Sequence, residues 1–83
     1  MATIVAKATA SLVDKCLALA TDALKLPTQH IWLDYDHDAD VLYISFRKPQ
    51  RATRTIEVDD GILIRKAGRN IVGLTILNAS ARQ

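Results

Sequence analysis

The sequence predicts an α+β fold, in which one N-terminal amphipathic helix is packed on an antiparallel β-meander of about five short strands. Residues 1–26 contain neither Gly nor Pro and are rich in Ala and Leu, as a long helix requires. After Thr28, the spacing of apolar residues changes from about 3.6 to about 2, which is typical of strands. The connections between the later apolar runs are too short for crossover helices, and this favours antiparallel pairing.

The helix is expected over residues 3–26, because Pro27 disfavours a helical conformation at its predecessor. Polar residues recur at spacings of three and four and form one stripe along it. The remaining surface is apolar and wider than one sheet face needs, unless its Ala positions are simply exposed. We therefore predict that the helix packs on its own sheet and also against a second copy of the chain. The residues predicted for this self-association are Val13, Leu17, Ala20 and Leu24.

The sheet is expected over residues 30–78, where apolar and polar residues alternate. The alternation predicts five strands, at 30–36, 41–47, 53–58, 62–66 and 71–78. The dipeptide Asp60-Gly61 favours a tight hairpin between the third and fourth strands, and Gly68 begins the turn before the fifth.

Size and composition predict one ordered domain over residues 1–83. Hydrophobic residues make up 49% of the 83 residues and charged residues 24%, which excludes a disordered chain. A monomer this small has difficulty covering so much apolar surface, so the composition favours a homo-oligomer. The net charge of +2 is far below the basic excess typical of dedicated nucleic-acid-binding proteins.

Residues 34–40 carry four aspartates at alternate positions, a pattern that suggests a calcium loop. Such a loop needs Gly at its sixth position and Glu at its twelfth. In neither register does the sequence supply them, whether the loop begins at Asp34 or at Asp36. We interpret the segment as a turn in which Asp side chains bond nearby backbone amides, with adventitious cation binding as the alternative.

The sequence contains no arrangement typical of an enzyme or a cofactor-binding protein. It has no nucleophile elbow, no Gly-rich phosphate loop and no metal-ligand spacing, so we predict a non-catalytic protein without a cofactor. The single cysteine, Cys16, is interpreted as apolar filler of the helix and suits a reducing compartment. Charged residues interrupt every apolar run before it reaches the ~20 residues of a membrane span, and we therefore expect a cytoplasmic protein.

Three runs in the strand region carry a resemblance to a known family. They are Leu33–Asp36 continuing through Ala39–Ile44, then Glu57–Ile62, and then Ile71–Ser80. Together, over about residues 31–80, they resemble the bacterial family called domain of unknown function 2283 (DUF2283), and the helix lies outside the resemblance. The resemblance implies a small sheet domain without an established activity, and an antitoxin-like partnership with a small toxin as one expectation.

The leading functional hypothesis is a protein-interaction module that forms a homodimer or larger homo-oligomer, or binds another small protein. The alternative is nucleic-acid binding through the basic segment 47–54, which would depend steeply on salt. Its contacts would come from Arg47, Lys48, Arg51 and Arg54. A further alternative, small-ligand binding or enzymatic activity, requires a cleft with converging polar groups.

Overall fold

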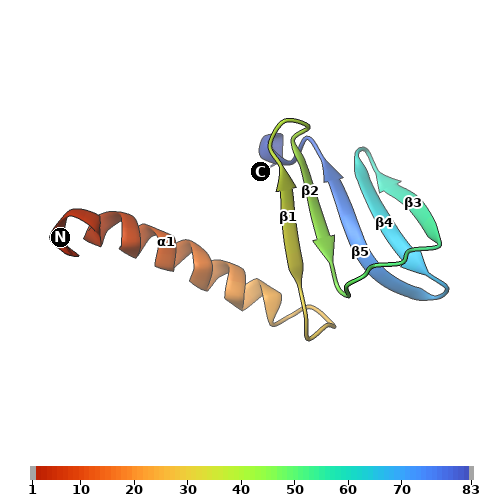
Figure 1. The fold of residues 1–83 in the computed structure, drawn as a ribbon, viewed down its shortest axis with the longest axis horizontal. Coiled ribbons are helices and arrows are strands. Elements are labelled where there is room, and N and C mark those ends of the chain that lie inside the picture. The colour runs from red at the N-terminus through yellow and green to blue at the C-terminus, as the bar shows by residue number, and fades with distance from the viewer. Residues whose placement is uncertain (1, 83) are drawn as a thin grey trace.

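A computed structural model describes residues 2–82, and their side chains from residue 8 onward. Helix α1 is followed by five strands and a short 3-10 helix, η1 (Figure 1). The bounds are Ala2–Ala23 for α1, Trp32–Asp36 for β1, Val41–Ser45 for β2, Arg54–Asp59 for β3, Ile62–Ala67 for β4, Asn70–Leu77 for β5 and Ala79–Ala81 for η1. The predicted α+β class and the antiparallel five-stranded sheet are confirmed.

The strand order is β1-β2-β5-β4-β3, which corrects the expected meander. The final strand, β5, lies at the centre of the sheet between β2 and β4. The connection 46–53 carries the chain from β2 to the opposite edge, where β3 begins. Its two ends are fixed by hydrogen bonds from Phe46 N to Val72 O at 2.9 Å and from Thr53 N to Lys66 O at 2.7 Å. The connection thus leaves the place beside β2 free for β5.

The predicted turns after β3 and β4 are present and use glycine in the left-handed region. Gly61 has a φ of 72° and Gly68 a φ of 61°, values that residues with a Cβ rarely adopt. The carboxylate of Glu57 also accepts a hydrogen bond from Gly61 N at 3.1 Å. Asp60-Gly61 therefore forms the tight hairpin that the sequence predicts.

Helix α1 does not pack on the sheet, contrary to the sequence-based expectation. Figure 1 shows it projecting away from the β1 side of the sheet, and the side chains of residues 8–22 are all exposed. The helix ends at Ala23, before the expected residue 26, because Leu26 N bonds to Ala23 O at 3.1 Å and so tightens the last turn. The segment after the helix, and not the helix, contacts the sheet, because Leu26 and Pro27 line a groove at one end of it. The helix points outward.

The described chain has almost no enclosed core. Val41 and Val72 are its only buried apolar residues, at 7% and 3% exposure. The chain exposes 6716 Å², whereas a compact monomer of 9.1 kDa exposes about 4,900 Å². The radius of gyration is 15.5 Å, against about 12 Å for a compact domain of this length. An isolated chain therefore exposes about 1,800 Å² more than its size predicts.

Candidate interaction surface

One face of the sheet, which we call the apolar face, is apolar across all five strands. Residues that are paired directly across neighbouring strands point to the same side, so the register identifies its members. One row runs through Leu33, Ile44, Leu74, Ile64 and Ile56, and a second through Tyr35, Leu42, Ile76 and Ile62. None of these nine side chains is buried. In a monomer, the face that should form the core therefore lies open.

A groove of about 530 Å³ occupies one end of the apolar face. Its walls are mostly aliphatic and aromatic, and they combine the sheet with the segment that follows α1. The lining residues are Leu26, Pro27, Thr28, Phe46, Arg47, Ile64, Asn70, Ile71, Val72 and Leu74. Thr28 fixes the path of this segment, because its Oγ1 donates a hydrogen bond to His30 O at 2.9 Å. Most of the groove is apolar, and Thr28, Arg47 and Asn70 are its polar lining residues.

The exposed helix provides a second apolar surface on the same chain. Leu17 is 60% exposed and Leu24 87% exposed, and both belong to the predicted self-association residues. Val13 and Ala20 are also exposed. The helical spacing of Val13, Leu17 and Ala20 puts them on one side of α1, and Leu24 lies in the turn directly after its end. Cys16 is also exposed, which corrects its interpretation as filler.

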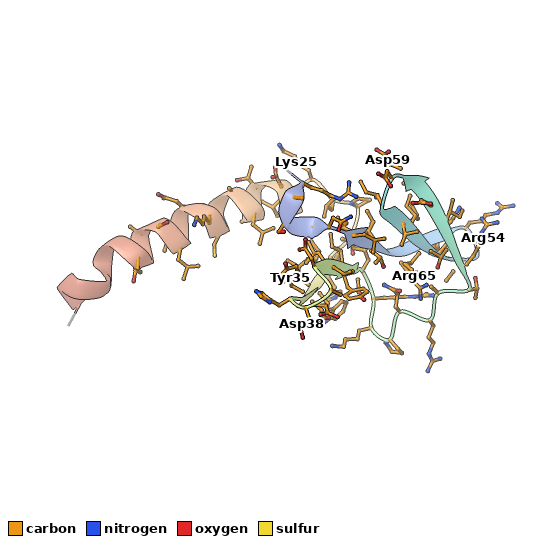
Figure 2. All side chains as sticks on the ribbon, turned by 90° about the horizontal axis from the view of Figure 1, so that it is seen from above. Lys25, Tyr35, Asp38, Arg54, Asp59 and Arg65 are labelled. Atoms are coloured by element: carbon orange, nitrogen blue, oxygen red, sulfur yellow. The ribbon has the colours of Figure 1, made fainter. Side chains whose placement is uncertain are left out.

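The opposite face of the sheet, which we call the polar face, carries a polar network where the connection 46–53 crosses it. Gln50, from the connection 46–53, donates from Nε2 to Ser45 Oγ at 3.0 Å and accepts from Arg65 Nε at 3.0 Å. Arg65 Nη1 also donates to Thr55 Oγ1 at 2.6 Å. Figure 2 shows Arg65 on the side of the sheet where this connection passes. Gly73 lies below the Gln50 amide, where a Cβ would collide with it. The two faces therefore differ in chemistry, and the polar one is already satisfied within the chain.

Asp40 joins the turn after β1 to the C-terminal η1. Its carboxylate accepts hydrogen bonds from the Tyr35 hydroxyl at 2.6 Å, from Ser80 N at 3.0 Å and from Ser80 Oγ at 2.8 Å. The bond from Tyr35, followed by those from Ser80, holds the pKa of Asp40 below its ordinary value. The same bond to the Asp40 carboxylate raises the pKa of Tyr35. Asp40 and Ser80 are 40 positions apart, so no local pattern predicts their contact, although both lie in the runs that resemble the family.

Two aspartates of the acidic segment 34–40 accept hydrogen bonds from within the chain. Asp36 Oδ1 accepts a hydrogen bond from Ala39 N at 3.1 Å, and Asp40 binds Ser80 as described above. In the part of the chain that the structure describes, no three His, Cys, Asp or Glu residues are grouped to hold a metal ion. Asp36 and Asp40 thus accept hydrogen bonds from backbone amides, as Asp side chains in turns commonly do.

The basic residues named for nucleic-acid binding gather at the connection 46–53. Arg47, Lys48 and Arg51 are exposed on it, and Arg54 begins β3 (Figure 2). Arg47 Nε donates to Gln50 O at 3.2 Å. Within residues 2–82, an ion pair is formed between Lys25 and Asp22 but by none of these four residues. Their charges are thus available to solvent.

Comparison with known proteins identifies a family but no activity. A family model described as "Protein of unknown function (DUF2283)" matches residues 32–80, which is more than half of the chain. The match contains all five strands and Ser80, whereas α1 lies outside it. No curated protein and no solved structure matches the chain significantly. Among the described residues, no helix combines the length and the apolar character needed to cross a bilayer.

Proposed function

The chain belongs to the DUF2283 family of proteins of unknown function, and we propose that it acts as a non-catalytic protein-interaction module that assembles with further copies of itself. The observation that carries this proposal is the uncovered apolar face. Its first row crosses all five strands and its second row crosses β1, β2, β5 and β4, and neither row contains a charged side chain. Water contact with such a surface is unfavourable, so the functional unit is expected to bury it.

The amount of exposed surface fits an obligate assembly. The excess of about 1,800 Å² per chain is roughly twice the ~800 Å² that each partner buries in a standard interface. It lies in the range of obligate homodimers, whose interfaces resemble a domain core divided between two chains. Seven of the ten residues that line the groove are apolar, and this composition supports an apolar side chain as its occupant rather than a polar metabolite.

Light scattering on the purified chain tests the proposal directly. We expect a mass of at least twice the 9.1 kDa of one chain. Leu33→Lys places a charge on the apolar face at a position that is 47% exposed, and it should shift the mass toward that of the monomer.

The matched control is Tyr43→Lys, which adds the same charge on the polar face, at a position that is 41% exposed. It should leave the assembly intact. Circular dichroism on both variants verifies that the sheet remains folded. A wild-type chain that is monomeric at all concentrations would overturn the proposal.

Nucleic-acid binding is the second candidate, because the four basic residues around the connection 46–53 have no acidic partner within the described chain. Replacement of Arg51 and Arg54 by Gln should then weaken binding to duplex or single strands and reduce its salt dependence. The control is Lys15→Gln together with Lys25→Gln, which removes the same charge from α1 and the turn that follows it. Absence of binding at low salt would exclude this candidate.

A further inference from the structure

We infer that two chains exchange their helices, so that α1 of each chain lies across the apolar face of the other chain's sheet. This inference rests on the proposed self-assembly and specifies which surfaces meet. The occupant of the apolar face is thus a second copy of this chain, and its contacting element is α1.

The chain carries two unpartnered apolar surfaces that match each other in chemistry. The apolar face is open across its whole width, and α1 bears Leu12, Leu17 and Leu19 at 61%, 60% and 54% exposure. If only one of these surfaces were buried, the other would remain in contact with water. Packing of the helix on the sheet buries both. Helix-on-sheet packing is also the usual way for an α+β chain to form its core.

The two surfaces also match in size. A helix of 22 residues is about 33 Å long, and five strands at a spacing of about 4.8 Å make a sheet about 19 Å wide. One helix can therefore cross the full apolar face and still leave its last turns beyond the sheet edge. Those turns are needed to connect α1 to its own sheet.

The direction of α1 explains why the contact forms between chains. Figure 1 shows α1 leaving from the β1 side, beyond the edge of its own sheet. The segment Leu26–Thr28 already lines one end of the apolar face of the same chain, so it leads the helix outward. A second chain related by a two-fold axis can receive this helix and return its own. Such a reciprocal interface closes at two copies.

Single-cysteine chains test which surfaces meet. The first chain keeps the native Cys16 on the helix. The second carries Cys16→Ser together with Leu33→Cys or Ile56→Cys, at opposite ends of one row of the apolar face. The matched control carries Cys16→Ser with Asp34→Cys, which neighbours Leu33 but points to the polar face. The two chains are mixed, and their subunits are allowed to exchange. The mixture is then treated with a short bismaleimide, and the products are separated by mass.

Helix exchange predicts linked pairs of the first and second chains. The yield with Leu33→Cys or Ile56→Cys should be at least ~fivefold higher than with Asp34→Cys. Only the thiols on the apolar face lie close to the Cys16 thiol of the partner's helix, which gives that thiol a high effective concentration. A dimer that links only Cys16 to Cys16, or only sheet cysteine to sheet cysteine, would overturn helix exchange while preserving self-assembly. A chain that light scattering finds monomeric would overturn both.

Discussion

At the scale of single residues, Asp40 is the clearest determinant of this fold. It has a φ of 55°, in the region where Asp and Asn are favoured among residues with a Cβ. Its carboxylate binds Tyr35 and Ser80, and its backbone oxygen accepts from Ala79 N at 3.0 Å. One side chain therefore closes the β1–β2 turn and fixes the segment after the central strand.

Replacement of Asp40 should lower the thermal stability of the protein. Asp40→Ala removes three hydrogen bonds and introduces a residue that disfavours positive φ. Asp40→Asn introduces a residue that also adopts positive φ, and it retains part of the hydrogen bonding. We expect the melting temperature to fall in both variants, and further in Asp40→Ala. The control is Asp38→Ala in the same turn, which should melt close to the wild type. Equal melting of all four proteins would contradict the structural role of Asp40.

The hydrogen bonds to Asp40 also predict how stability responds to acid. Because the folded chain lowers the pKa of this carboxyl, its contribution is complete above the ordinary value of 3.8 and is lost as the pH falls through the folded pKa. The wild type should therefore lose its advantage over Asp40→Asn between about pH 4 and the acid limit of folding. Parallel thermal melts from pH 7 downward measure this convergence. A constant difference at all pH values would contradict it.

Gly73 determines how closely the connection 46–53 approaches the sheet. A Cβ at this position would lie 2.5 Å from Ile44 O, on backbone that is fixed by the central pairing. Gly73→Ala should thus destabilise the fold by about 1–3 kcal/mol in denaturant unfolding. Combining it with Gln50→Ala removes the side-chain collision but leaves the one with Ile44 O. The double variant should therefore stay less stable than Gln50→Ala alone.

At the scale of elements, α1 has no tertiary contacts that would maintain it in an isolated chain. Exposed helices are marginal in water, because most helical stability in proteins comes from packing of an apolar side. The ion pair of Lys25 with Asp22 is exposed, with 3.9 Å between Nζ and Oδ1, and pairs of this kind add little. We therefore expect the persistence of α1 in solution to depend on the proposed partner surface.

Hydrogen exchange can measure this dependence element by element. In the wild-type assembly, the amides of α1 should be protected together with those of the sheet. Leu17→Lys introduces a charge into the apolar side of α1 and should release the helix, so that its amides exchange faster than those of β5. The control, Ser11→Lys, adds the same charge on the polar stripe and should preserve protection. Fast exchange of α1 in the wild type would show that the helix has no partner.

The sequence predicted the elements well and their arrangement only in part. Alternation located all five strands, because each has one apolar side. The position of β5 at the centre could not be predicted, since local patterns do not determine where the connection 46–53 delivers β3. The apolar width of α1 predicts packing on its own sheet and on a second copy, and the structure contradicts the first of these expectations. The bond between Asp40 and Ser80 escaped detection because its ends are 40 residues apart.

At the scale of the whole molecule, folding and assembly are expected to be one process. Among the described residues, Val41 and Val72 are the only buried hydrophobic side chains, so the single chain lacks the enclosed core that normally offsets conformational entropy. Burial of the apolar face by a second chain would supply this core. The folded state then depends on the concentration of chains, as it does for obligate dimers.

The melting temperature should therefore rise with protein concentration. From the usual unfolding enthalpy per residue, a dimer of two 83-residue chains should gain about 4 °C for each tenfold increase in concentration. Calorimetry or circular dichroism over two decades of concentration measures this slope. Tyr43→Lys, with its charge on the polar face, should retain the slope, whereas any folded Leu33→Lys monomer should lose it. A melting temperature that is independent of concentration, together with a monomeric mass, would mean that the apolar face remains in water, contrary to the proposed assembly.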